Sequence, residues 1–99
     1  YTNEADMLNR IVFGQTAAEW KKTNPSLAKS GKNQRDYAST SQLVILANLE
    51  SLNSHMIAKG APQSDRITEL AHEAKRQYQT FVDIDTIKRQ DKKRLADEN

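Results

Sequence analysis

The segment from Ser39 to Gly60 constrains the fold of this chain most strongly. Ser39 and Gln42 have the spacing of a capping box, in which two side chains bond backbone N–H groups at the start of an α-helix. Apolar residues then recur on one face at a period of about 3.6 residues and cover about half of the helix circumference. These residues are Ile45, Leu49, Leu52 and Met56, widened by Leu43, Leu46 and Ile57. The segment therefore predicts the central core helix of the fold.

A further helix is expected on each side of this segment. Asn3 is a suitable N-cap, and Gly14 a suitable left-handed residue at the end, for a helix over residues 3–14. Its expected core-facing residues are Ala5, Leu8, Ile11 and Val12. Pro62 fits the first turn of a later helix, and the apolar stripe of that helix consists of Ile67, Leu70, Ala71, Ala74, Tyr78 and Phe81. Because both stripes have helical spacing, we expect both helices to pack against the central one.

A short helix and a polar segment lie between the first helix and the central one. Thr16 and Glu19 form a second capping box, and the proline that follows ends this helix because the residue before a proline avoids the helical region. Residues 24–38 are rich in turn-forming residues, which predicts a loop. We expect Leu27 and Tyr37 to pack inward from it.

The C-terminal end of the chain is highly charged and has no helix breaker. Neither glycine nor proline occurs between Pro62 and Asn99, and residues 83–99 carry ten charges, five of each sign. Several β-branched residues within 82–87 mark a candidate position for a kink. We therefore predict an all-α protein. A compact bundle of about four helices is expected over residues 1–82, and a charged, helical extension over residues 83–99.

Composition excludes several classes of protein. The chain has no cysteine, which excludes a disulfide scaffold, a thiolate metal site and thiol catalysis, and fits a reducing compartment. Its apolar runs are far shorter than a membrane span, and no signal-peptide pattern opens it. We therefore predict a cytoplasmic protein without a membrane partner. Since the chain begins at Tyr1 rather than at a methionine, we expect it to be a piece of a longer protein.

No motif in the sequence predicts catalysis. His55 and His72 lie opposite the apolar stripes and lack the spacing of a zinc site. The Ser30-Gly31-Lys32 stretch lacks the first glycine and the final hydroxyl residue of a phosphate-binding loop. We therefore predict no enzyme, no catalytic residue, no cofactor and no metal. A hidden hydrolase would have to gather its polar side chains in one cleft, and its best candidates are Asp36, Tyr37, Glu50 and Asn53.

Basic residues are concentrated in two runs, although the net charge is only +2. Residues 21–35 contain five bases and no acid, and residues 88–94 contain five bases and one acid. Such runs can contact a phosphate backbone with salt-sensitive, sequence-independent affinity. The candidate nucleic-acid contacts are Lys21, Lys22, Lys29, Lys32, Arg35, Lys92, Lys93 and Arg94. The alternative is an ordinary solvated surface, with ion pairs between the nearby acids and bases of the tail.

Asn53 is a polar residue inside the broad apolar arc of the central helix. A buried amide needs hydrogen-bond partners, and the Arg35-Asp36-Tyr37 stretch just before that helix offers them. One interpretation is that these residues pin the preceding segment onto the bundle. The other is that they form a polar recognition notch. Trp20 has the same two interpretations, as a core residue or as an anchor for a partner.

Several motifs occur in an order that points to a known family. They include YTNEADMLN (1–9), VFGQTA (12–17), NQRDYA (33–38) and LANLESLN (46–53). With these motifs, residues 1–80 resemble the C-terminal region of bacterial and phage proteins that carry an N-terminal KilA-N domain. The segment around residues 27–31 is longer than its family counterpart, and the tail beyond Thr80 has none. The resemblance implies that DNA is bound mainly by the KilA-N domain, which is not in this chain, and it transfers no site residue.

Composition, motifs and resemblance together predict a non-catalytic helical accessory domain. We expect it to mediate self-association, as a homodimer, or docking of a different protein. The alternative is an auxiliary contact to the DNA backbone through the basic loop and the tail.

Overall fold

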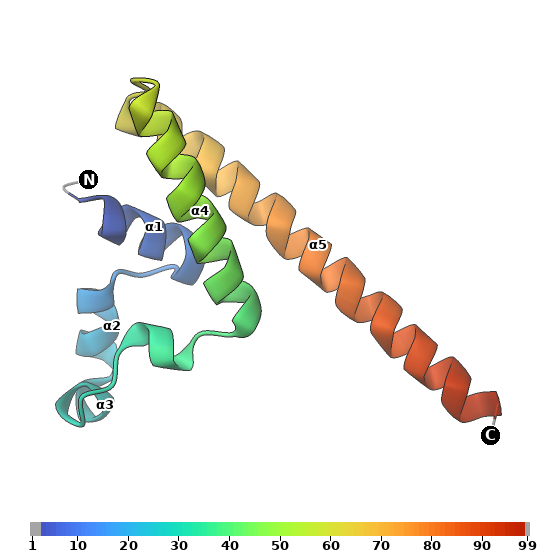
Figure 1. Ribbon diagram of the computed structural model, residues 1–99. Coiled ribbons are helices and arrows are strands. Elements are labelled where there is room, and N and C mark those ends of the chain that lie inside the picture. The colour runs from blue at the N-terminus through green and yellow to red at the C-terminus, as the bar shows by residue number, and fades with distance from the viewer. Residues whose placement is uncertain (1–2, 99) are drawn as a thin grey trace.

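The computed structural model describes the backbone of residues 3–98 and the side chains of residues 3–84. All regular elements in this range are helical, which confirms the predicted all-α class (Figure 1). There are five α-helices and one 3-10 helix within the described range. In chain order they are α1 (Glu4–Phe13), α2 (Ala17–Thr23), α3 (Pro25–Lys29), the 3-10 helix η1 (Gln34–Tyr37), α4 (Thr40–Ala58) and α5 (Gln63–Glu98).

The predicted caps form at the start of three helices. The Asp6 N–H donates to Asn3 Oδ1 over 2.7 Å at the start of α1. Complete capping boxes open α2 at Thr16 and α4 at Ser39. Gly14 ends α1 with φ of 80°, a conformation that glycine adopts without a steric cost. Local hydrogen bonds therefore fix most helix boundaries, as the sequence predicted.

The expected loop at residues 24–38 is mostly helical instead, so that prediction is wrong. Pro25 begins the one-turn helix α3, a position where its missing N–H costs nothing. Asn33 caps η1, since its Oδ1 accepts the Arg35 N–H over 3.1 Å. The Asp36 carboxylate completes this cap by accepting the Asn33 N–H over 2.8 Å. The residues that suggest turns also start short helices, so composition did not separate the two.

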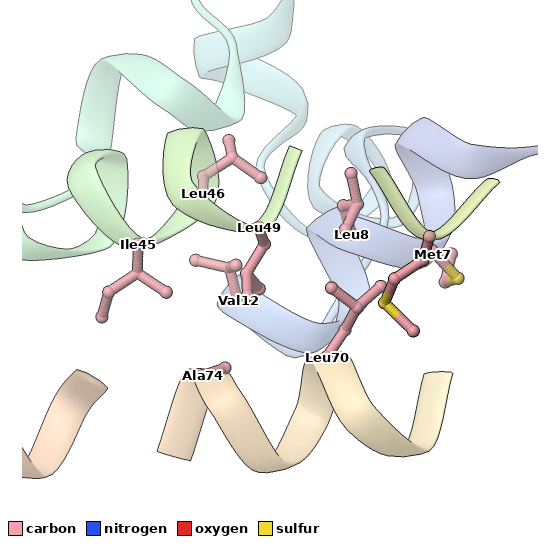
Figure 2. Close-up of a cluster of buried hydrophobic side chains, with 9 residues drawn as sticks. Met7, Leu8, Val12, Ile45, Leu46, Leu49, Leu70 and Ala74 are labelled. Carbon is pink, nitrogen blue, oxygen red and sulfur yellow. The ribbon is translucent and has the colours of Figure 1, made fainter. Parts of the chain in front are cut away.

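The core lies where α1, α4 and α5 meet, and we call these helices the three-helix body (Figure 2). Ile45 and Leu49 of α4 and Leu70 of α5 are fully buried. The cluster consists of Met7, Leu8, Val12, Ile45, Leu46, Leu49, Met56, Leu70 and Ala74. The central position predicted for the α4 segment is therefore confirmed. None of the nine clustered side chains comes from α2, α3 or η1.

The buried arc of α4 is narrower than its apolar sequence suggests. Leu43 is 40% exposed and Ile57 is 46% exposed, although both were predicted to widen the core stripe. At 100° per residue, the buried residues from Ile45 to Met56 span only about 100° of the helix. Ala5 and Ala71, which were also expected to face the core, are exposed. Among the described elements, α1 and α5 make the main contacts with α4, so much of the circumference of α4 faces solvent.

The long helix α5 gives the molecule an extended, flat shape. The Cα trace measures 56 × 40 × 15 Å with a radius of gyration of 17.2 Å, whereas a compact chain of this length has about 13 Å. Figure 1 shows α5 running past the other helices. It continues as one helix through residues 82–87, so the break that was considered there does not occur. The short dimension leaves little room for more than one layer of helices, so wide surfaces of the body remain exposed.

Candidate functional site

A polar cluster of four side chains lies within the three-helix body. Asn53 of α4 is 3% exposed and Arg66 of α5 is 8% exposed. The Arg66 Nε donates to Asn53 Oδ1 over 3.0 Å, and the Arg66 Nη2 donates to Glu4 Oε1 over 2.8 Å. Asn53 Nδ2 donates to Glu4 Oε1 over 2.9 Å, and Gln63 Nε2 donates to Glu4 Oε2 over 2.8 Å. One carboxylate of α1 thus joins α4 to α5.

This cluster corrects the expected partners of Asn53. We expected the Arg35-Asp36-Tyr37 stretch to satisfy its amide, but Glu4 and Arg66 do so. The sequence held a signal for both residues. Glu4 lies one turn before Leu8, and Arg66 lies one turn before Leu70, so each continues a core-facing stripe. Polar residues on an apolar stripe are therefore candidates for a shared buried cluster.

The electrostatics of the cluster favour an ionised Glu4. The hydrogen bond from Asn53 lowers the pKa of the Glu4 carboxyl, and hydrogen bonds from Arg66 and Gln63 lower it further against the effect of burial. Arg66 also donates to the Ala61 carbonyl oxygen. These hydrogen bonds join α1, α4 and α5 at one point of the body.

A hollow of about 500 Å³ lies next to this cluster, between α1 and α4. Arg35 and Glu50 stand at it as an ion pair with Nη2 and Oε1 3.3 Å apart, and Asn53 also lines it. Asp36 and Tyr37 are not among the residues that line it. The structure therefore brings together two residues of the predicted notch, Arg35 and Asn53. Of the four hydrolase candidates, Glu50 and Asn53 also line this hollow, whereas Asp36 and Tyr37 do not.

The second candidate site consists of α2, α3 and η1, which we call the basic lobe. It lies to one side of the three-helix body (Figure 1). Four lysines on it are exposed and form no ion pair with another residue in the described part of the chain: Lys21, Lys22, Lys29 and Lys32. Arg35 differs from them because its charge is paired with Glu50. The side chains of Lys92, Lys93 and Arg94 lie outside the described residues.

An aromatic pair joins two elements of the basic lobe. The rings of Trp20 in α2 and Tyr37 in η1 stack with centroids 5.8 Å apart and an interplanar angle of 28°. Trp20 is 7% exposed, whereas Tyr37 is 55% exposed. The expectation that Tyr37 packs inward is therefore wrong. One side of its ring rests on Trp20, and more than half of the side chain faces solvent. Trp20 is buried, but outside the main core cluster.

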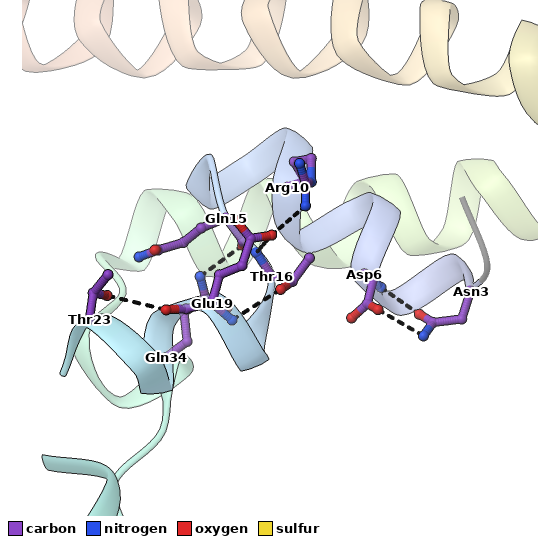
Figure 3. A network of polar contacts seen from close by, with 8 residues as sticks. All are labelled: Asn3, Asp6, Arg10, Gln15, Thr16, Glu19, Thr23 and Gln34. Atoms are coloured by element: carbon purple, nitrogen blue, oxygen red, sulfur yellow. Dashed lines mark hydrogen bonds and ion pairs between the residues drawn. The ribbon is translucent and has the colours of Figure 1, made fainter. Parts of the chain in front are cut away.

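Polar contacts attach the basic lobe to the body (Figure 3). Arg10 of α1 forms an ion pair with Glu19 of α2. Gln34 of η1 is buried, and its Nε2 donates to the Gln15 carbonyl oxygen over 3.0 Å. Its Oε1 has no hydrogen-bond partner among the described residues. Glu19 is therefore used both by the ion pair and by the capping box that begins α2.

The described residues contain neither a metal-binding cluster nor a membrane-spanning helix. His55 and His72 are exposed, as predicted. Within residues 3–84, no three acidic or histidine side chains gather closely enough to hold a metal ion. Among the described helices, none combines the length and the hydropathy that crossing a bilayer requires. The pKa of Glu73 is lowered to about 2, chiefly by hydrogen bonds from Arg76 and then from Gln77, and this cluster lies on the surface of α5.

Comparison with known proteins gives no match: no protein-family model, no curated protein and no solved structure is similar to this chain.

Proposed function

We propose that the chain is a non-catalytic helical accessory domain of a DNA-binding protein of the KilA-N type, as found in bacteria and phages. Its function is self-association or docking of a partner protein in the cytoplasm. The motifs within residues 1–80 support the family, and the helical body described above suits such a role. In this proposal residues 1–82 form the domain, residues 83–99 form a charged helical extension, and the KilA-N domain makes the main DNA contact.

The observation that carries this proposal is apolar surface on α4 and α5. Leu43 and Val44 at the start of α4 are each 40% exposed, and Ile84 of α5 is 41% exposed. Asn48 Nδ2 donates to Gln77 Oε1 over 3.0 Å, which fixes the register of the two helices at this end of the body. Phe81 is only partly buried there, beside a shallow hollow of about 240 Å³. A second helix can cover this surface.

The free energy that this apolar surface can contribute decides which residues such a dimer needs. Full burial of an aliphatic side chain contributes about 1.5–3 kcal/mol, so the remaining exposed part of each contributes about 1 kcal/mol. Three such side chains from each of two copies give about 6 kcal/mol, whereas association costs about 4–15 kcal/mol. Apolar contact alone is therefore insufficient. Residues 83–99, with five acids and five bases, supply additional self-complementary charge without net repulsion.

Sedimentation velocity of the whole chain over the micromolar range tests this proposal. We expect the native chain to be a dimer. The double variant Val44→Asp with Ile84→Asp should be a monomer, because it replaces two apolar side chains of the contact with charged ones. Thr68→Asp with His72→Asp places two charges on exposed positions of α5 far from the apolar surface, and it should leave the dimer intact. A chain that sediments as a monomer at every concentration contradicts self-association.

A contact to the nucleic-acid backbone is the second candidate function. The specific observation that favours it is the set of four exposed lysines on the basic lobe. This function predicts DNA affinity that falls as salt rises. Lys29→Glu with Lys32→Glu should abolish it while the helical signal in circular dichroism is retained.

A further inference from the structure

We propose that the basic lobe binds single-stranded nucleic acid, with the exposed face of Tyr37 stacking on a base and with Lys21, Lys22, Lys29 and Lys32 contacting phosphates. This inference rests on the second candidate function above. It adds the form of the strand and the way in which the strand is held.

The positive charge of the lobe is not neutralised from within. Its two acidic residues are Glu19 and Asp36. Glu19 pairs with Arg10 of α1 and caps α2, and Asp36 caps η1. The four lysines therefore keep their charge available for a phosphate backbone. The paired Arg35 is left out of this count, so the expected number of phosphate contacts is four.

The aromatic pair supplies the second half of the site. Tyr37 is held in place on one side by Trp20, and the capping box of Asn33 and Asp36 holds the backbone of η1. A ring fixed in this way loses little conformational freedom when a base stacks on it. Base stacking on aromatic side chains is a common feature of sites for single strands, because every base has a π face.

The same geometry argues against a duplex as the preferred ligand. In a double helix the bases are stacked on one another, so the exposed Tyr37 ring has no base face to contact. An anionic membrane or an acidic protein would also use the lysines, and the effect of Tyr37→Leu together with competition by vesicles distinguishes these ligands from a single strand. The combination of lysines with an exposed ring is the arrangement that sites for single strands use.

Fluorescence anisotropy of the whole chain with a labelled oligothymidylate of about 15 nucleotides, within the range of site sizes of OB folds that bind single strands, tests the proposal. With four phosphate contacts, the slope of log affinity against log salt is about −2.8 for a single strand. Affinity should therefore fall about 50-fold between about 50 and 200 mM salt. Trp20 is the only tryptophan, so its emission reports independently on stacking at Tyr37.

Substitutions of Tyr37 separate stacking from simple charge attraction. Tyr37→Leu keeps an apolar side chain against Trp20 but removes the π face, and it should weaken binding about 5- to 150-fold. Tyr37→Phe keeps the ring and should bind as the native chain does. Unchanged affinity in Tyr37→Leu, with helical content retained, overturns the proposal.

Substitutions of lysine test the position of the phosphate contacts. Lys21→Gln with Lys22→Gln should reduce the salt slope by about 1.4. Lys59→Gln with Lys75→Gln makes the same charge change at exposed positions on the body and should alter neither slope nor affinity. Equal losses in the two double variants would show that attraction is diffuse and would refute the assigned site.

Comparison ligands distinguish this inference from the functions on which it draws. A duplex of equal length that binds as tightly as the single strand, with no effect of Tyr37→Leu, supports backbone contact but overturns the single-strand site. Vesicles of anionic lipid that compete with the oligonucleotide, again without an effect of Tyr37→Leu, overturn it in favour of a membrane surface. Sedimentation of the lysine variants should match the native chain, so a failure of binding is separable from a failure of self-association.

Discussion

Arg66 offers the sharpest test of how the three-helix body is held together. It is the fourth residue of α5, where the positive end of the helix dipole makes a cationic side chain unfavourable. Its stabilising effect must therefore come from contacts with other segments. Replacement by alanine removes the donors to Asn53 Oδ1, to Glu4 Oε1 and to the Ala61 carbonyl oxygen.

The loss of stability depends on how exposed to water each acceptor is after the substitution. The Glu4 side chain is 39% exposed, so water replaces much of what it loses. Asn53 is 3% exposed, so its oxygen stays without a partner, at about 1–3 kcal/mol. The loss of a charge-assisted hydrogen bond adds about 1–2 kcal/mol after screening. We expect Arg66→Ala to lower the free energy of unfolding by about 2–5 kcal/mol, from a total of about 5–15 kcal/mol.

Urea unfolding followed by circular dichroism at the helical band measures this loss. Arg76→Ala is the matched control on the same helix, because Arg76 is 62% exposed and pairs with Glu73. It should cost much less than Arg66→Ala, because water solvates both partners of an exposed ion pair. A loss in Arg66→Ala no larger than that in Arg76→Ala would refute the reasoning, since burial would then make no difference to an arginine contact.

Three further outcomes test other parts of the structure. The pKa of Glu73 is lowered from 4.5 to about 2, so its stabilising effect is complete above pH 4.5 and is lost as the pH falls toward 2. The loss of stability caused by Glu73→Gln should therefore become smaller over that pH range. Urea titrations at a series of pH values measure this. Ser39→Ala removes the capping box of α4 and should lower the free energy of unfolding by about 1 kcal/mol, as measured by urea titration. Leu70→Ala should cost about 2–5 kcal/mol, and Leu43→Ala much less, because the first side chain is fully buried and the second is 40% exposed.

The sequence predicted those features that depend on neighbouring residues. The capping boxes at Thr16 and Ser39 join residues three apart, so their pattern is visible without knowledge of the fold. The contacts among Glu4, Asn53 and Arg66 join residues up to 62 apart. They form only where three helices converge, so no local pattern contains them. A polar residue on a core-facing stripe indicates that a hydrogen-bond partner is needed. Which residue is that partner depends on how the helices pack.

The candidate sites were predictable to different degrees. The charge of the basic lobe is evident from composition, and its lysines are exposed as expected. The stacking of Tyr37 on Trp20 was missed because the two residues are 17 positions apart and the whole of α3 lies between them. An aromatic residue in a polar segment indicates either burial or a contact surface, and only the position of η1 against α2 distinguishes them.

The placement of α2, α3 and η1 outside the main core has a consequence for amide hydrogen exchange. The described polar contacts that attach them to the body are the Arg10–Glu19 and Arg35–Glu50 ion pairs and the Gln34 hydrogen bond. Opening this region exposes far less apolar area than unfolding α4, so it requires less free energy. Backbone amides of α2 should therefore exchange with deuterium well before those at the centre of α4, and two protection levels should appear in one small chain.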